Sequence, residues 1–330
     1  MSEKLYAIAQ ANIEKSIEEV FKPENSGSYL KVLSRFRQYD YQNQLLILKQ
    51  DPEARYILGV DAAKRAGMEV TSDTPKIMLL YPQITKDQAG KYKAETQVVA
   101  GISVSREIRE PQATVSSVVN AARSASGFTI TLGEKGDFPD KKNYYADTQA
   151  RRLVIREGLE GVDFAREVIS CYVEFRFARK EKNDYYTVME QFVRLAVQDV
   201  LGVLPQKPYY PNLAAIVMQE APADVKRAFL DELSDVSRQI ADELTNPTLS
   251  FTEIAILNAV MNTDKADELT VLIKTVAETL DPGDIRDAAF GLSEKCLHLS
   301  DEALSGLYER VRRRSLTAAE PVYISYRVEE

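Results

Sequence analysis

The stretch YDYQNQLLILKQDPEARYILGVDAAKRAGMEV, residues 39–70, holds the densest local structural signals in this chain of 330 residues. Its run of large aliphatic residues at 45–48 predicts a short buried helix. A helix over residues 62–66 is predicted to end at Gly67, because glycine accepts the left-handed conformation that closes many helices. Apolar and β-branched runs at residues 76–81 and 97–104 then predict paired strands. The stretch therefore predicts a small helical domain with a β-hairpin.

The flanking sequence predicts further helices and strands. Upstream, residues 4–21 predict a helix, residues 23–28 a break at Pro23, and residues 29–36 a second helix. Downstream, helices are predicted at residues 115–125, 163–180 and 185–201, strands at 128–132 and 152–155, and mostly helix from 223 to 314. We therefore expect an α+β protein with three parts. They are a helical and β-hairpin domain at residues 1–107, a second α+β domain at 112–245 and an acidic helical module at 246–330.

Composition excludes several classes of function. Histidine occurs once, at His298, whereas most zinc hydrolases and catalytic triads need at least one histidine and metallohydrolases usually need two. The two cysteines, Cys171 and Cys296, lie far apart and indicate free thiols in a reducing cytoplasm. No apolar run is long enough to span a membrane, and no glycine loop of a phosphate-binding kind occurs. We expect a cytoplasmic protein that uses no cofactor and no membrane.

The net charge of −8 is unevenly distributed. Residues 1–85 hold 11 basic and 11 acidic groups, residues 86–203 hold 18 and 17, and residues 204–330 hold 13 and 22. A globally acidic chain is not expected to hold duplex DNA by counterion release, although a basic face on a neutral domain can bind a strand. The acidic last third is interpreted either as a protein-docking surface or as a helical bundle that its charges keep soluble.

Residues 39–70 resemble the N-terminal domain of the ArdC antirestriction family. That domain has the pattern Tyr-x-x-x-Asn-x-Leu-Leu-Ile, then a proline, a glycine before an apolar residue, and a helix that ends in glycine. The matching residues here are Tyr39, Asn43, Leu45, Leu46, Ile47, Gln50, Pro52, Gly59 and Gly67. In that family the domain is associated with single-stranded DNA binding. The resemblance implies a non-enzymatic accessory protein of a mobile genetic element, binding DNA or countering host defence.

The segment NYYADTQARRLVIREGL, residues 143–159, resembles the strand before the zinc helix of the ImmA/IrrE-type metallopeptidase domain that often follows the ArdC N-terminal domain. Such a helix carries His-Glu-x-x-His, because residues four apart share a face. Alignment places Ser170 and Glu174 at the histidine positions, Cys171 at the glutamate position and Gln191, beside Glu190, at the third ligand. The resemblance implies a degenerate zincin-like domain without metal or catalysis. A rescued metal site of Cys171, Glu174 and Glu190 is the alternative.

The nucleic-acid surface implied by the resemblance is reduced in this chain. The family has an aromatic residue on the helix before Gly67 and a basic loop after it, where this chain has Ala63 and then Met68 and Glu69. The remaining candidates for strand binding are Tyr39, Tyr41, Arg55, Lys64, Arg65 and Lys76. Alternatively, the tyrosines pack in the core and the basic groups are ordinary solvated charges. The second functional hypothesis is a pseudoenzyme scaffold or inhibitor that binds a protein partner and no nucleic acid.

Overall fold

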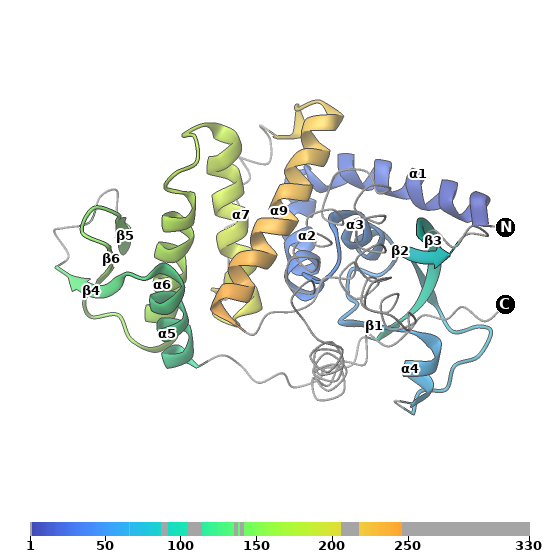
Figure 1. Ribbon diagram of the computed structural model, residues 1–330, viewed down its shortest axis with the longest axis horizontal. Coiled ribbons are helices and arrows are strands. Elements are labelled where there is room, and N and C mark those ends of the chain that lie inside the picture. The colour runs from blue at the N-terminus through green and yellow to red at the C-terminus, as the bar shows by residue number, and fades with distance from the viewer. Residues whose placement is uncertain are drawn as a thin grey trace. The chain divides into compact units, whose positions relative to one another are not determined.

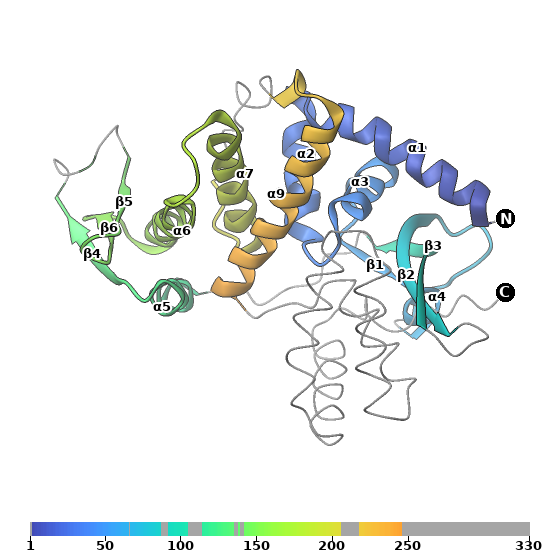
Figure 2. The ribbon, with the colours of Figure 1, turned by 45° about the horizontal axis from the view of Figure 1, so that its top comes forward.

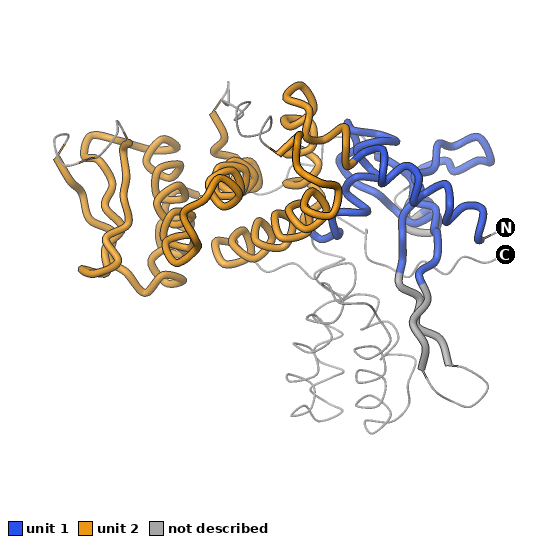
Figure 3. The backbone as a smooth tube through the Cα atoms, turned by 90° about the horizontal axis from the view of Figure 1, so that it is seen from above, with its two compact units in different colours: residues 1–16, 38–110, 249–330 blue, residues 17–37, 111–248 orange. Residues whose placement is uncertain are grey.

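The structure, a computed structural model, describes residues 2–65, 67–86, 92–104, 114–134, 138, 142–205 and 218–245. These residues divide into two compact units, shown in two colours in Figure 3. The first unit takes its described residues from Met1–Ser16 and Gln38–Glu110, and the second from Ile17–Arg37 and Pro111–Thr248. Each unit combines helices with a three-stranded sheet, which confirms the predicted α+β class.

Several predictions fall on residues that the structure does not describe. His298, Cys296 and the whole acidic module at 246–330 lie outside the described residues. The three predicted domain ranges therefore remain predictions. Within the described part, no helix is both long enough and apolar enough to cross a membrane.

The first unit is built on an antiparallel sheet of order β1-β3-β2. Its strands are β1 (Tyr56–Leu58), β2 (Lys76–Lys86) and β3 (Tyr92–Val104), and its helices are the first part of α1 (Ser2–Val20), α3 (Tyr41–Gln50) and α4 (Val60–Arg65). The predicted hairpin is confirmed by β2 and β3, which pair over the full length of β2. Helix α3 packs on β2 (Figure 1).

Helix α3 begins where a capping side chain meets an apolar run. The Asp40 carboxylate accepts a hydrogen bond from the Asn43 backbone N–H at 2.7 Å, which satisfies a donor that has no partner within the helix. Leu45, Leu46 and Ile47 follow and are fully buried, as predicted. Beyond α4, Gly67 has a φ of 78°, the predicted left-handed conformation.

The core of this sheet depends on a missing side chain at Gly101. A Cβ atom there would lie 2.3 Å from Cγ2 of Ile57 and 3.6 Å from Cδ1 of Leu79. Ile57 and Leu79 are both fully buried, so neither side chain has room to move away. Glycine at this position of β3 therefore lets β1 and β2 pack closely on one face of the sheet.

The second unit is built on a mixed sheet of order β4-β6-β5. Its strands are β4 (Thr129–Gly133), β5 (Tyr144–Asp147) and β6 (Arg152–Arg156), and its helices are α2 (Pro23–Arg35), α5 (Val115–Ser126), α6 (Gly161–Phe177), α7 (Asp184–Val200) and α9 (Ala223–Leu244). Strand β4 is parallel to β6 and β5 is antiparallel to it. Helix α6 packs on β5 and β6, α7 packs on α6, and α2 and α9 pack on α7 (Figure 2). The helices predicted at 115–125, 163–180 and 185–201 and the strands predicted at 128–132 and 152–155 are confirmed, apart from small shifts at their ends. Of the mostly helical stretch predicted from 223 to 314, the structure describes the part up to residue 245, where α9 lies.

The break predicted at residues 23–28 is wrong. Pro23 opens α2 in its first turn, and Glu24 follows it. Proline suits this position because its missing N–H would have no acceptor within the helix. Ser26 is buried inside α2, and its hydroxyl donates to the Lys22 carbonyl oxygen at 3.3 Å. The polar residues that suggested a break thus lie within the helix.

Two carboxylates of α9 hold this helix against the α6–α7 hairpin. Glu232 accepts a hydrogen bond from the Lys180 ammonium at 2.9 Å. Glu243, three turns later, accepts one from the Tyr172 hydroxyl at 2.6 Å and also pairs with Arg176. The relative placement of α6 and α7 is therefore fixed from outside the hairpin as well as by their own contact.

Candidate functional site

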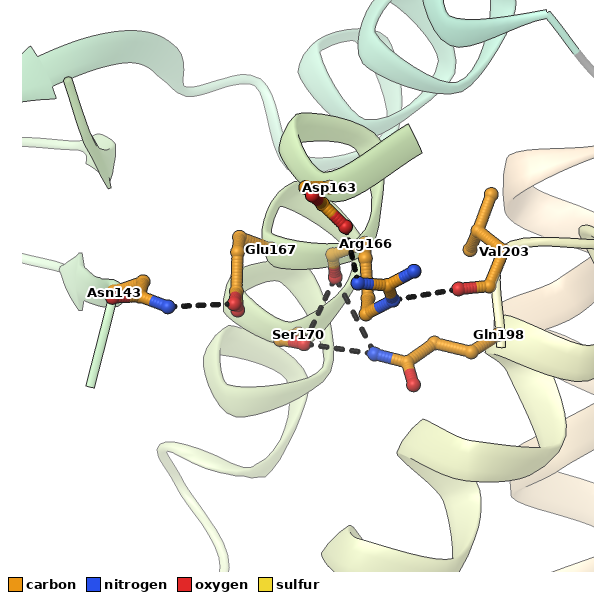
Figure 4. A network of polar contacts seen from close by, with 7 residues as sticks. All are labelled: Asn143, Asp163, Arg166, Glu167, Ser170, Gln198 and Val203. Atoms are coloured by element: carbon orange, nitrogen blue, oxygen red, sulfur yellow. Dashed lines mark hydrogen bonds and ion pairs between the residues drawn. The ribbon is translucent and has the colours of Figure 1, made fainter. Parts of the chain in front are cut away.

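Ser170 of α6 occupies the first of the resembled ligand positions. Its side chain is buried, and its hydroxyl donates to the Arg166 carbonyl oxygen at 2.9 Å. Gln198 of α7 donates its side-chain amide to Ser170 Oγ at 3.0 Å, as Figure 4 shows. The Ser170 hydroxyl is therefore engaged in joining α6 to α7.

Further polar contacts extend this network along α6 (Figure 4). Arg166 donates through Nε to the Val203 carbonyl oxygen at 2.7 Å and pairs with Asp163 at 2.6 Å. At the next residue of α6, Glu167 accepts a hydrogen bond from the Asn143 side-chain amide at 3.0 Å. These contacts tie α6 to the segment after α7 on one side and to the segment before β5 on the other.

Cys171, at the resembled general-base position, is fully buried. Burial raises the pKa of its thiol far above the ordinary range; Glu174 raises it further, while a hydrogen bond from the Val154 backbone acts in the opposite direction. A metal ligand has to be a thiolate, and a thiol in this setting stays protonated at neutral pH. A metal ion would have to displace this proton and reach a side chain that has no exposed surface.

Glu174, at the second resembled ligand position, pairs with a lysine. Lys142 Nζ lies 2.7 Å from Glu174 Oε2 and 5.5 Å from the centroid of the Tyr144 ring. Partial burial acts to lower the pKa of Lys142, but Glu174 outweighs it and the pKa is raised overall. The negative charge of Glu174 is thus already balanced by a side chain.

Glu190, Arg194 and Gln198 of α7 are spaced by four residues and so share one face of the helix. Arg194 donates to the Tyr144 hydroxyl at 2.6 Å. Burial raises the pKa of the Glu190 carboxyl, Arg194 partly offsets this, and Glu174 raises it further. Gln191, which the sequence places at the third ligand position, is half-buried and lies one residue away from this face.

This corner of α6, α7 and β5 holds one ion pair, Lys142–Glu174, and beside it Arg194 and Glu190, which interact with each other electrostatically. Within the ranges that the structure describes, no three His, Cys, Asp or Glu side chains are placed to hold a metal ion. A divalent ion brought beside Lys142 and Arg194 would also be repelled by both of them. The arrangement is chemically suited to holding α7 on the sheet.

The two tyrosines proposed to stack on bases differ in exposure. Tyr39 is only 1% exposed, and Tyr41 is half-buried at the start of α3. Stacking needs an accessible ring face. Tyr39 is therefore placed in the core of the first unit, and only Tyr41 keeps accessible surface.

The basic candidates gather at one end of the first sheet. Arg55, just before β1, is exposed, and its backbone N–H donates to the Val104 carbonyl oxygen at 3.0 Å. Lys76 is exposed at the start of β2, opposite Ile102 of β3. Lys64 is exposed on α4, which packs on β1 and β3. The Arg65 side chain lies outside the described part of the structure.

Asn43 and Gln50 have a role that the sequence did not reveal. The Leu80 backbone N–H donates to Asn43 Oδ1 at 2.7 Å, and Asn43 Nδ2 donates to the Leu80 carbonyl oxygen at 2.9 Å. Gln50 makes the same pair of bonds with Met78, at 2.8 and 3.0 Å. Two amides seven residues apart on one helix, followed by a strand, are the only signal of this arrangement in the sequence. They pair with the outer edge of β2 as a neighbouring strand would.

The chain is similar to a protein of known structure. No protein-family model matches the chain, and no curated protein matches it. Among solved structures, the chain is similar to the metal-free crystal structure of the antirestriction ArdC protein from the R388 plasmid. The TM-score is 0.43 at 11% sequence identity, over 70% of this chain and 96% of that one. The function of this chain has to be argued from its own residues.

Proposed function

We propose that this protein is a non-enzymatic, ArdC-like accessory protein of a mobile genetic element, of the antirestriction type, which binds single-stranded DNA through its first unit. The resemblance of residues 39–70 to the ArdC N-terminal domain supports the choice of ligand. The observation that carries the non-enzymatic part is the pairing of Glu174 with Lys142 beside Arg194. Binding, rather than bond cleavage, is the mechanism.

The positions of a zincin centre are unsuited to hydrolysis in this chain. A zinc-bound hydroxide needs three anionic or imidazole ligands and a general base. Here the corresponding positions hold the hydrogen-bonded hydroxyl of Ser170, the protonated thiol of Cys171 and the lysine-paired carboxylate of Glu174. Metal analysis of the mildly purified full chain is expected to find no stoichiometric zinc. One zinc per chain, lost in Cys171→Ala or Glu174→Ala, would overturn this part of the proposal.

Strand binding by the first unit rests on charge more than on stacking. Arg55, Lys64 and Lys76 are exposed around one end of the sheet, and Tyr41 keeps part of its surface. Residues 1–85 as a whole carry 11 basic and 11 acidic groups, so their net charge is zero. The attraction for DNA therefore comes only from the local cluster of basic side chains. Binding is therefore expected to be weak and strongly dependent on salt.

The test is titration of a labelled single-stranded oligonucleotide with the full chain across a salt series. Lys64→Ala and Lys76→Ala are each expected to weaken binding and to reduce the salt slope by about 0.7 for each phosphate that the variant no longer neutralises. Lys182→Ala, an exposed lysine of the second unit, is the matched control and should change neither quantity. Absence of binding at low salt, or equal weakening in the control, contradicts the assignment.

The acidic excess of residues 204–330, with 13 basic and 22 acidic groups, favours a second candidate function. In this alternative the protein is a pseudoenzyme that docks a basic protein surface and binds no nucleic acid. Pull-downs with the full chain and with a chain that ends at Thr245 separate the two functions. A partner captured only by the full chain, without strand binding, favours the alternative.

A further inference from the structure

Among the residues that the structure describes, strand β4 has a partner on one backbone edge only. It lies at the margin of its sheet and pairs only with β6, in parallel. The Thr129 N–H donates across this pair to the Arg151 carbonyl oxygen at 3.1 Å. Because alternate residues of a strand direct their backbone groups to opposite sides, Ile130 and Leu132 direct their N–H and C=O groups outward. Among the described residues, nothing hydrogen-bonds to these four groups.

The usual protection of such an edge is missing from β4. Exposed edge strands commonly carry a proline, a charged side chain or a bulge that prevents pairing with another chain. The sequence of β4 is TITLG, which has no proline and no charge. Leu132 is 64% exposed, so an apolar side chain stands in solvent beside unpaired backbone groups. An edge of this kind is a template for another strand.

The sequence of β4 is complementary to itself in an antiparallel register centred on Thr131. In this register Ile130 of one copy lies opposite Leu132 of the other as a hydrogen-bonded pair, so all four outward groups of each copy gain partners. Thr131 lies opposite the same residue of the second copy in a non-hydrogen-bonded pair. Apolar pairs and threonine pairs across strands are both stabilising.

The charges at the strand ends fit the same register. Residue 134 then lies opposite residue 128, which brings the exposed Glu134 of one copy to Phe128 of the other. The Arg151 guanidinium lies over the Phe128 ring, 5.8 Å from its centroid. Arg123, whose side chain makes no ion pair with any described residue, lines an open groove of about 640 Å³ beside Phe128, together with Asn120, Ser124, Gly127 and Thr129. In this register the acidic end of the strand of one copy lies beside the end of the other that carries Phe128 and the two arginines.

We propose that β4 pairs with β4 of a second copy of this chain, about a twofold axis that passes between the two Thr131 residues, and so joins two three-stranded sheets into one continuous sheet. The pairing is isologous, because the same edge is used by both copies. It does not depend on the proposed binding of single-stranded DNA, which uses the other unit.

Disulfide trapping tests the register directly. Sedimentation of the full chain is expected to show a concentration-dependent dimer. Thr131→Cys is expected to form a disulfide-linked dimer on mild oxidation, since facing Cα atoms in a non-hydrogen-bonded pair lie about 4.5 Å apart, within reach of a disulfide. Ser116→Cys, exposed on α5 of the same unit, should remain unlinked. A monomer at all concentrations, or equal linking in the control, overturns the proposal.

A charge exchange tests the strand ends. Glu134→Arg and Arg123→Glu are each expected to weaken the dimer roughly tenfold, because like charges then face each other across the strands. The double variant should recover most of the affinity. Leu132→Lys should abolish the dimer, whereas Val162→Lys, at an apolar side chain that is 49% exposed in the same unit, should keep it. A dimer that survives Leu132→Lys uses another surface, and the proposal then fails.

Discussion

The outer edges of β2 and β4 both direct backbone groups of alternate residues away from their sheets. Met78 and Leu80 of β2 meet the amides of Gln50 and Asn43, which return one donor and one acceptor to each residue. Ile130 and Leu132 of β4 meet no such side chain in the described part of the chain. One helix with two well-spaced amides can thus satisfy the outward groups of two residues at a sheet edge, as a neighbouring strand would. The outer edge of β4 has no such amide side chains among the described residues, although the chain provides them at β2.

We call the outer edge of β2 the closed edge, because Asn43 and Gln50 pair with it. Removing the Asn43 amide, the more deeply buried of the two, should have the greatest effect on this edge. Asn43→Leu leaves the buried N–H and C=O of Leu80 without partners, so the free energy of unfolding is expected to fall by about 3 kcal/mol. Urea unfolding measures this change, and hydrogen exchange at Leu80 should accelerate. Gln42→Leu is the matched control on the same helix, because Gln42 is half-buried and its side chain reaches only the Tyr41 hydroxyl. Equal destabilisation of the two variants would mean that the edge amide stabilises nothing.

A methyl group added to the face of each sheet should destabilise the first sheet more than the second. Gly101→Ala puts a Cβ atom 2.3 Å from Ile57 and is expected to cost about 2 kcal/mol through overpacking. Gly133→Ala in β4 meets Val154 and Phe138 at 3.0 and 3.1 Å and should cost about half as much. Thermal unfolding of the two variants gives the comparison. A larger destabilisation at Gly133 would show that the second sheet is the more tightly packed of the two.

Gln50→Ala should weaken the closed edge less than the change at Asn43. Gln50 is half-buried, so water can reach the Met78 groups that the variant releases, and a decrease in unfolding free energy of about 1 kcal/mol is expected. Hydrogen exchange should accelerate at Met78 and stay slow at Leu80, which keeps its own amide partner. If both amides exchange faster together, the two clamps act as one cooperative unit.

The smallest expected difference between the first and second units is in the pH dependence of their stability. The amides of Asn43 and Gln50 do not titrate, so the closed edge should be indifferent to pH. Burial and Glu174 raise the pKa of Glu190 in the second unit, against the opposing effect of Arg194. Its stabilising contribution is therefore complete below the unfolded pKa, near 4.5, and is lost as pH rises through the folded value. In Glu190→Gln, the hydrogen-exchange protection of α7, measured relative to the unfolded chain, should no longer depend on pH between 4.5 and 8. The protection of α3 should be the same in the variant and the original chain.

The sequence predicted those helices and strands whose apolar or β-branched residues follow a regular spacing within the element itself. The β-branched runs of β2 and β3 and the apolar periods of α5, α6 and α7 were sufficient, because each element carries its own spacing. Strand β1 was missed, since three residues become a strand only by pairing with Ile102 to Val104, far along the chain. The Pro23 break was wrong because a proline has opposite meanings at the first turn of a helix and in its interior.

The candidate site was predictable on one helix and unpredictable across two. The spacing of Ser170 and Glu174 on α6 follows from the period of a helix. The α7 residues that meet them are Gln198, Arg194 and Glu190. Which turn of α7 faces α6 depends on how far the two helices slide along each other, and no local pattern records that. Tyr39 raised a similar difficulty, because a tyrosine followed by a buried helix suits a core and a binding surface equally.

Lys142 pairs with Glu174, and Arg194 donates to the Tyr144 hydroxyl, so two cations are held in one corner of the second unit. A bound ion has a dissociation constant, so the part of a fold that depends on it follows the free metal in its surroundings and yields to chelators. The cationic side chains of Lys142 and Arg194 are covalently part of the chain and cannot dissociate from it. The corner between α6, α7 and β5 should therefore keep its shape through zinc starvation or zinc excess.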